Sequence, residues 1–215
     1  VSRRQLAEEA FDIARNDLHL PDGVQDFYLA SFGNFVILDI DHSGAVHVSH
    51  AQIKRETQEQ FEQNVLLFYT GVRRSSTELL QEQKMKLEFD EWDAVQRKHE
   101  IKRIGKDILA CFESGDLDKF GRLMDEHWRV KKGMSQKMST DLFDEIYEQI
   151  KREGALGGKI VGAGGGGFFL VYAPREAQPG IRRIFQERGM REIAWRVDAG
   201  GTHVLVQRPR TVNTI

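Results

Sequence analysis

The sequence has a single cysteine, Cys111, which excludes a disulfide within the chain and a metal site built from several cysteines. Cys111 falls in an apolar helical stripe, so we expect a core residue in a protein of the reducing cytoplasm. No stretch approaches the ~18 consecutive apolar residues of a membrane-spanning helix. The 31 basic and 33 acidic residues give a net charge of −2, without the basic excess typical of nucleic-acid-binding proteins. We therefore expect neither a membrane nor a nucleic acid as a partner.

Glycine is concentrated in one stretch. Seven of the eleven residues 157–167 are glycine, and the apolar run 168–172 follows at once. Glycine reaches positive φ angles and, lacking a Cβ, lets another chain or an anion come close to the backbone amides. A flexible linker or a plain tight bend is the alternative, but linkers seldom lead directly into five bulky strand-forming residues. The pattern favours a loop with a specific role at the start of a strand.

Two well-known nucleotide-binding loops do not fit this stretch. Gly162, Gly164 and Gly167 match G-x-G-x-x-G by letter, but a dinucleotide-binding loop follows a strand and opens a helix, whereas these glycines open a strand. A Walker A loop around Gly158 and Lys159 fails as well, because its first glycine and its hydroxyl residue are both missing.

The remaining pattern predicts an α+β fold with an antiparallel sheet. Alternating apolar residues on both sides of a short turn predict a β-hairpin, and apolar residues at spacings of three and four predict helices. The expected strands are 34–41, 45–53, 64–70, 168–172, 192–197 and 202–207, and the expected helices are about 6–14, from 75 onward, 101–112, 117–128, 140–150 and 174–189. Residues 208–215 are expected to form a disordered tail.

Asp26 stands between apolar and aromatic neighbours just before the predicted hairpin. A carboxylate in such a place is either a helix cap or a working group, and the residues alone do not decide between the two. The histidines and aspartates of the hairpin itself could suggest a metal site. Strand alternation places the aspartates on a solvated face, however, so no metal site is predicted.

Two basic segments are candidates for binding an anion. Arg74 follows a predicted strand and precedes a predicted helix, where guanidinium and free amide groups both donate to phosphate, although a basic surface turn is the simpler interpretation. Lys131 and Lys132 lie at the end of another predicted helix, where basic residues also complement the helix dipole. Both interpretations stay open in each case.

Residues 155–168 resemble the third, C-terminal motif of the GHMP superfamily of small-molecule kinases, in the form typical of D-glycero-D-manno-heptose 7-phosphate kinases. Segments 23–33, 67–75 and 120–132 resemble the same branch and follow in family order. The resemblance implies a ferredoxin-like antiparallel sheet with helices on one face.

Domain boundaries and residue roles follow from the same resemblance. Residues 1–33 would end the N-terminal kinase domain, 34–207 would form the C-terminal domain, and 208–215 the tail. Asp26 would face the sugar hydroxyl that is phosphorylated, as a base or an orienting anion. The implied substrate-binding residues are Gln25, Arg74, Lys131 and Lys132, and the implied nucleotide-binding residues are Gly162, Gly164, Gly165, Gly166 and Gly167. The family usually carries Gln where this chain has Phe27, a departure that affects one polar contact to the sugar and not the carboxylate. The kinase interpretation requires Asp26 and the glycine segment to face one shared cavity.

The family's phosphate loop, of P-x-x-x-G-L-x-S-S form, occurs nowhere in the sequence, and Val1 leads almost directly into a predicted helix. In the family this loop belongs to the N-terminal domain and contacts the nucleotide phosphates and Mg²⁺. We therefore expect the C-terminal part of a cytoplasmic, ATP- and Mg²⁺-dependent sugar kinase that acts on the anomeric hydroxyl of a heptose 7-phosphate and is inactive without its N-terminal half. The alternatives are another GHMP sugar kinase, galactokinase-like or from an antibiotic pathway, and a non-catalytic ferredoxin-like binding module. A homodimer is compatible with each.

Overall fold

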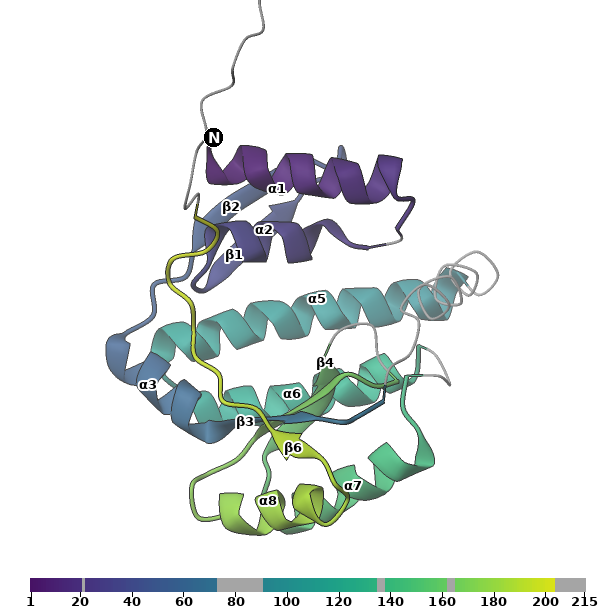
Figure 1. The fold of residues 1–215 in the computed structure, drawn as a ribbon, viewed down its shortest axis with the longest axis vertical. Coiled ribbons are helices and arrows are strands. Elements are labelled where there is room, and N and C mark those ends of the chain that lie inside the picture. Colours follow the sequence, from purple (N-terminus) through teal and green to yellow (C-terminus); the bar gives the residue numbers. More distant parts are fainter. Residues whose placement is uncertain (21, 73–90, 135–137, 162–164, 204–215) are drawn as a thin grey trace, which may run out of the picture. The chain divides into compact units, whose positions relative to one another are not determined.

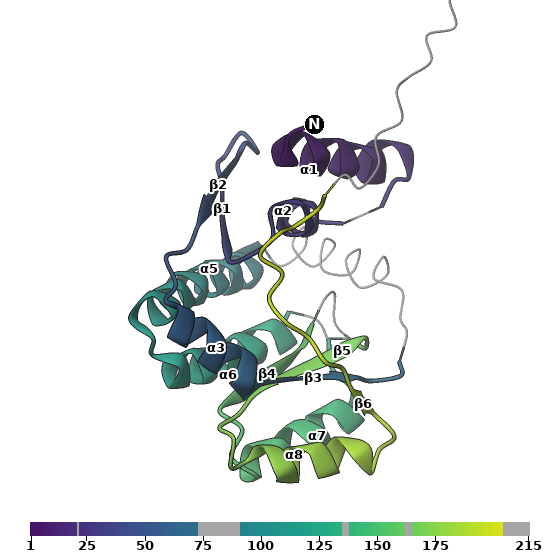
Figure 2. The same ribbon diagram turned by 60° about the vertical axis from the view of Figure 1, so that its left-hand side comes forward.

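The computed structural model describes residues 1–20, 22–72, 91–134, 138–161 and 165–203, drawn in Figures 1 and 2. The chain divides into two compact units. The first combines Val1–His50 with Val197–Ile215, and the second is Ala51–Arg196. This division by packing does not decide where kinase domains begin and end, so the predicted boundary at residue 33 stays a prediction. The predicted tail lies outside the described residues.

The first unit contains two helices and a hairpin around a small core. Its elements are α1 (Arg3–Asp12), a π-helical turn η1 (Ile13–Asp17), α2 (Val24–Phe32), β1 (Val36–Ile40) and β2 (Val46–His50). The predicted hairpin is confirmed, with Val36 opposite His50 and Ile40 opposite Val46. Its buried core consists of Ala7, Tyr28 and Val46, with partly buried Val24, Phe32, Leu38 and Val48 around them.

The second unit is built on a four-stranded antiparallel sheet. Its strands are β3 (Val65–Tyr69), β4 (Gly157–Val161), β5 (Phe168–Tyr172) and β6 (Arg191–Glu192), and their order in the sheet is β4-β5-β3-β6. This is the strand order of the β-α-β-β-α-β ferredoxin-like arrangement, since the first and third strands lie in the middle. The predicted α+β fold class and the ferredoxin-like sheet are confirmed.

Helices lie on the sheet in two groups. The helices of this unit are α3 (Arg55–Asn64), α5 (Glu91–Ser114), α6 (Leu117–Lys132), α7 (Asp141–Arg152) and α8 (Gln178–Gln186). Helices α7 and α8 cover one face of the sheet, as expected, and Figures 1 and 2 show α6 beside β4 on the other side. The main core joins the sheet to α7 and α8 and includes Phe68, Ile146, Ile160, Phe169, Ile181 and Phe185. The Phe68 and Phe185 rings stack with centroids 3.9 Å apart.

Cys111 is buried, so the prediction of a core cysteine is confirmed. Across the described ranges, no helix is long and apolar enough to cross a membrane.

Three element predictions need correction. Helix α8 begins at Gln178 and not at Pro174, because Pro179 has no amide proton and is tolerated only in the first turn of a helix. The predicted strand 192–197 ends early, since β6 covers only Arg191–Glu192. Ile193 N–H still donates to Leu67 O, but the next donor to β3 is the Trp195 indole, 3.2 Å from Val65 O. Thr202 and His203 form no strand, and the rest of that predicted strand lies outside the described residues.

Candidate functional site

Asp26 lies in the first turn of α2 with its side chain exposed. Gly23 occupies the N-cap position, so Asp26 is not the capping residue that the sequence left open. The Gln25 amide folds back over Gly23, where its Nε2 would lie 2.7 Å from a Cβ. Phe27 packs against Phe11 with ring centroids 5.7 Å apart, which orients this turn of the helix. A negative side chain at a helix N-terminus is stabilised by the helix dipole, and exposure leaves the Asp26 carboxylate accessible to a ligand.

The glycine segment forms the connection between β4 and β5, and its described part is tied to the end of β3. Gly167 N–H donates to Val72 O at 2.9 Å, and Gly167 O accepts bonds from both the amide and the hydroxyl of Thr70. Gly165 N–H donates to Met138 O at 2.9 Å. Gly165 and Gly167 have φ angles of 71° and 86°, which glycine adopts without strain.

These bonds limit what the segment can offer a nucleotide. The amides of Gly165 and Gly167 are already paired, so they do not fit the task of donating to a phosphate. Gly166 is buried, and a Cβ there would lie 2.7 Å from Val72 O. The described glycines therefore shape the bend. Gly162, Gly164 and Arg74 lie outside the described residues, and the assignment of the five glycines to nucleotide binding stays a prediction.

The first glycines of the motif serve helix packing. A Cβ on Gly157 would overlap the carbonyl oxygen of Gly121, and a Cβ on Gly121 would lie 2.6 Å from the Tyr172 ring. The backbones of α6 and β4 thus approach each other closely only because both positions are glycine. This contact sets the position of the α6 side chains over β4.

Lys131 and Lys132 lie on the last turn of α6 in different surroundings. Lys132 Nζ donates to Asp144 Oδ1 at 2.9 Å and lies 5.9 Å from the centre of the Tyr147 ring. Ser139 also donates to Asp144, so Lys132 belongs to a polar network with α7. Lys131 is more enclosed, and burial lowers its pKa. The substrate-binding role of both lysines stays a prediction.

Sequence reasoning missed two basic residues beside Lys131. Burial and the charge of Lys131 lower the pKa of Lys159, on β4, to about 8. Burial and the charges of Lys159 and Lys131 lower the pKa of His127 to about 4. Two signals in the sequence could have found them: His127 lies four residues before Lys131 on one helix face, and strand alternation turns Lys159 away from buried Ile160.

A buried carboxylate, Asp125, lies between α6 and α7. Tyr147 Oη donates to its Oδ1 at 2.6 Å, Arg129 pairs with its other oxygen, and Lys151 Nζ lies 3.8 Å away. Burial alone would raise the pKa of Asp125, but the Tyr147 hydroxyl, Arg129 and Lys151 outweigh burial and hold it below its ordinary value. Because these donors satisfy the carboxylate, it fastens α6 to α7.

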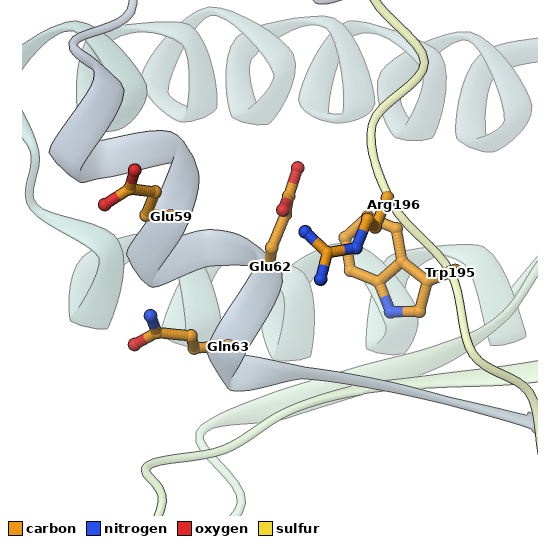
Figure 3. Close-up of a pocket in the computed structure, with 5 residues that line it drawn as sticks. All are labelled: Glu59, Glu62, Gln63, Trp195 and Arg196. Carbon is orange, nitrogen blue, oxygen red and sulfur yellow. The ribbon is translucent and has the colours of Figure 1, made fainter.

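Two cavities lie elsewhere in the second unit. One, of 330 Å³, is bounded by Glu59, Glu62 and Gln63 on α3 and by Trp195 and Arg196 after β6, and Figure 3 shows the Arg196 guanidinium directed toward Glu62. The other, of 490 Å³, is lined by Phe68, Arg182, Gln186, Gly189, Met190, Arg191 and Glu192. No predicted site residue lines either cavity.

Comparison with known proteins points to one family. Residues 108–189 match the family model described as GHMP kinases C terminal. The chain is 28% identical over 186 residues to D-glycero-alpha-D-manno-heptose 7-phosphate kinase of Campylobacter jejuni, a match that covers 86% of this chain and 54% of that protein.

Solved structures agree on the fold. A D-glycero-D-manno-heptose 1-phosphate kinase from Bacteroides thetaiotaomicron superposes with a TM-score of 0.69 at 23% identity, covering 92% of this chain and 53% of the other. Streptococcus pneumoniae phosphomevalonate kinase, solved with phosphomevalonate and AMPPNP, gives a TM-score of 0.68 at 13% identity, covering 89% of this chain and 60% of the other. The chain spans about half the length of the Campylobacter and Bacteroides kinases. Residues 108–189 therefore have the sequence pattern of a GHMP kinase C-terminal domain, and the sheet of the second unit has the fold of such domains.

Proposed function

We propose that the chain is the C-terminal part of an ATP-dependent sugar kinase that phosphorylates the anomeric hydroxyl of a heptose 7-phosphate. The observation that carries the proposal is the length of the match to the Campylobacter heptose 7-phosphate kinase. At 186 residues it is longer than the whole of Ala51–Arg196, so it extends into the first unit. A GHMP C-terminal fold alone would support only the second unit.

Asp26 is the residue to which we assign the proton transfer. Its exposed carboxylate would accept or orient the proton of the attacking sugar hydroxyl. ATP, when bound, supplies the phosphoryl group, and Mg²⁺ neutralises part of its charge. The bonds of Gly165 and Gly167 within the chain assign the described glycines to holding the bend, so no step of the reaction is derived through them.

The test replaces Asp26 in the protein that includes the N-terminal half. Asp26→Asn keeps the size of the side chain and removes its charge, and we expect kcat to fall about 10²–10⁴-fold with an unchanged thermal midpoint. The matched control is Asp17→Asn, an exposed carboxylate of the same unit, which should leave kcat unchanged. Activity is measured as ATP-dependent phosphorylation of D-glycero-D-manno-heptose 7-phosphate.

The same assay separates the alternatives. A substrate panel that includes galactose distinguishes a heptose kinase from a galactokinase-like enzyme. Full activity of Asp26→Asn would contradict the catalytic assignment of Asp26, and no turnover of any sugar by the parent protein would favour a non-catalytic binding module. The 215-residue chain by itself is expected to show no turnover, because the family's phosphate loop is absent from its sequence.

A further inference from the structure

The position of Asp26 depends on the first turn of α2 and not on bonds of its own. Within the described ranges, the exposed Asp26 carboxylate forms no ion pair and no hydrogen bond. The turn that carries it also lacks a side-chain cap, because its N-cap residue is Gly23. The first amide groups of a helix have no partner within the helix, and helix ends without a cap fray. Whatever holds this turn therefore decides where the carboxylate lies.

Helix α1 lies beside α2 and contacts it through one face (Figures 1 and 2). Arg4, Glu8 and Phe11 are spaced four and three residues apart, so their side chains lie in one row along α1. Glu8 accepts a 3.3 Å hydrogen bond from the Tyr28 hydroxyl, and the Arg4 guanidinium lies 6.0 Å from the centre of the Tyr28 ring. These two contacts hold the middle of α2. Phe11 is the last residue of the row, and it contacts Phe27.

Phe11 reaches the first turn of α2 through the Phe27 ring. The two ring centroids lie 5.7 Å apart with an interplanar angle of 65°, the edge-to-face arrangement that aromatic rings favour. Phe27 directly follows Asp26, and its amide is the first of the helix that can donate to a carbonyl four residues earlier, that of Gly23. Val24 in the same turn packs on the small core but is itself only partly buried. Holding the Phe27 ring thus holds the hydrogen bond that closes the turn around Asp26.

We propose that Phe11, acting through Phe27, is a positioning residue for the Asp26 carboxylate. The inference rests on the proposed function for the role of Asp26, and on the contacts of α1 with α2 for how its position is fixed. In the absence of a cap, the packing of the two rings orders the turn before a substrate binds. A displacement of a reacting group by about 1 Å can lower a rate about 10²-fold, so disorder in this turn should lower kcat.

Amide exchange in the 215-residue chain tests the contact without any activity. Phe11→Ala removes the ring that Phe27 packs against, so the exchange rate of the Phe27 amide, measured by NMR, should rise about fivefold or more. The rise should be smaller in the last turn of α2. The matched control is Phe32→Ala, which removes a ring that stacks on Tyr28 at the other end of α2. It should change the exchange of the Phe27 amide less than about twofold, because the first turn opens locally.

A cap added by mutation orders the same turn in a second way. Gly23 has φ −82° and ψ 150°, which serine adopts at N-cap positions, and the atoms nearest to an added Cβ belong to the end of the flexible Gln25 side chain. In the Phe11→Ala background, Gly23→Ser should return the exchange rate of the Phe27 amide to within about threefold of the parent. Unchanged exchange in Phe11→Ala, equal acceleration along the whole of α2, or no rescue by Gly23→Ser would each overturn the proposal.

Kinetics of the protein that includes the N-terminal half connect the turn to the reaction. Phe11→Ala should lower kcat about 10–10²-fold and change KM for D-glycero-D-manno-heptose 7-phosphate less than about threefold, because a misplaced carboxylate loses transition-state stabilisation and not sugar binding. Phe11→Tyr keeps the ring and should restore kcat to within about twofold of the parent, and Phe32→Ala should stay within the same limit. An equal decrease of kcat in Phe11→Ala and Phe32→Ala would show a purely structural role.

Failure of this inference is distinguishable from failure of the kinase proposal, because the exchange experiment needs neither ATP nor turnover. Full activity of Asp26→Asn, combined with local acceleration of exchange in Phe11→Ala, would remove the catalytic assignment and leave only the contact. Loss of activity in Asp26→Asn, combined with unchanged exchange and unchanged kcat in Phe11→Ala, would remove only the positioning role.

Discussion

Among single residues, Asp125 shows most clearly what a buried charge does in this fold. Its side chain is only 10% exposed, and its oxygens are bonded by Tyr147 and Arg129. Breaking one partner of such a network leaves the others unsatisfied, which costs more than the bond itself contributes. The network therefore fixes the position of α6, the helix that also carries Lys131.

Tyr147→Phe tests this network. The variant removes one donor to a buried carboxylate, and we expect the free energy of unfolding at pH 7 to fall by about 1–3 kcal/mol. The pKa of Asp125 is held below its ordinary value in the fold, so its contribution is present above the unfolded pKa and is lost as pH falls through the lower, folded pKa. Without Tyr147 the folded pKa rises, so acid unfolding should begin at a higher pH.

Urea titrations between pH 7 and pH 3 measure both effects. The control is Tyr69→Phe, since among the described residues the Tyr69 hydroxyl has no hydrogen bond, and its free energy of unfolding should change by less than about 0.5 kcal/mol. An equal decrease in the free energy of unfolding of Tyr147→Phe and Tyr69→Phe would show that the hydrogen bond to Asp125 does not stabilise the fold.

Sequence reasoning could propose residues whose chemistry is visible in a motif, and it overlooked residues whose surroundings depend on packing. Asp26 was singled out by its apolar and aromatic neighbours and by the resemblance of its segment to the kinase motif; the structure leaves it exposed, and its catalytic role stays a prediction. Lys159 was overlooked because a lysine inside a glycine motif looks like part of the motif. Its burial depends on α6, which packs on β4 where Gly157 lies against the Gly121 carbonyl.

At the scale of elements, periodicity predicted most helices and strands but not all their limits. The hairpin was predicted from alternation in Val36, Leu38 and Ile40, and helix α7 ends before Gly154 with φ 103°, as its sequence indicated. Helix α2 was not predicted, because its nine residues carry several aromatic side chains and begin after glycine without a polar cap. The early end of β6 could not be predicted, because the sequence does not show that the Trp195 indole takes the place of a backbone donor to β3.

The contact of α6 with β4 gives an element-scale prediction. Gly157→Ala would place its Cβ on the Gly121 carbonyl oxygen, and neither atom can rotate away, because the backbone fixes the position of both. We expect the free energy of unfolding to fall by about 1–3 kcal/mol or more, because α6 must shift off the strand.

Gly105→Ala is the matched control for that substitution. Gly105 is exposed within α5, and nothing lies within 4 Å of an added Cβ. Alanine there should stabilise the protein by about 0.5–1 kcal/mol, since glycine in a helix interior is costly. Chemical denaturation of both variants checks the pair. A Gly157→Ala protein as stable as the parent would show that the two backbones are not closely packed.

For the whole molecule, the two units differ in how much apolar surface each has to keep it folded. The main core of the second unit joins a sheet to two helices, whereas three buried residues form the core of the first. Small cores give low local stability, because less apolar surface offsets the entropy of ordering the chain. The first unit nevertheless carries Asp26, so the proposed catalytic residue lies in the less stable unit.

Hydrogen exchange of backbone amides measures this difference. We expect amides of α1 and α2 to exchange faster than those of β3 and β5, because local unfolding requires less free energy where few apolar side chains are buried. Tyr28→Ala removes the largest buried side chain of the first unit's core, and Phe185→Ala removes one that is fully buried in the second.

Each variant should lower the free energy of unfolding of the unit that contains it by about 3–5 kcal/mol. Tyr28→Ala should accelerate exchange in α1 and α2 and leave β3 and β5 protected, whereas Phe185→Ala should accelerate exchange in β3, β5 and α8. Equal loss of protection in both units after Tyr28→Ala would mean that they unfold together. In that case, Asp26 would lie in a unit that needs as much free energy to unfold as the sheet does.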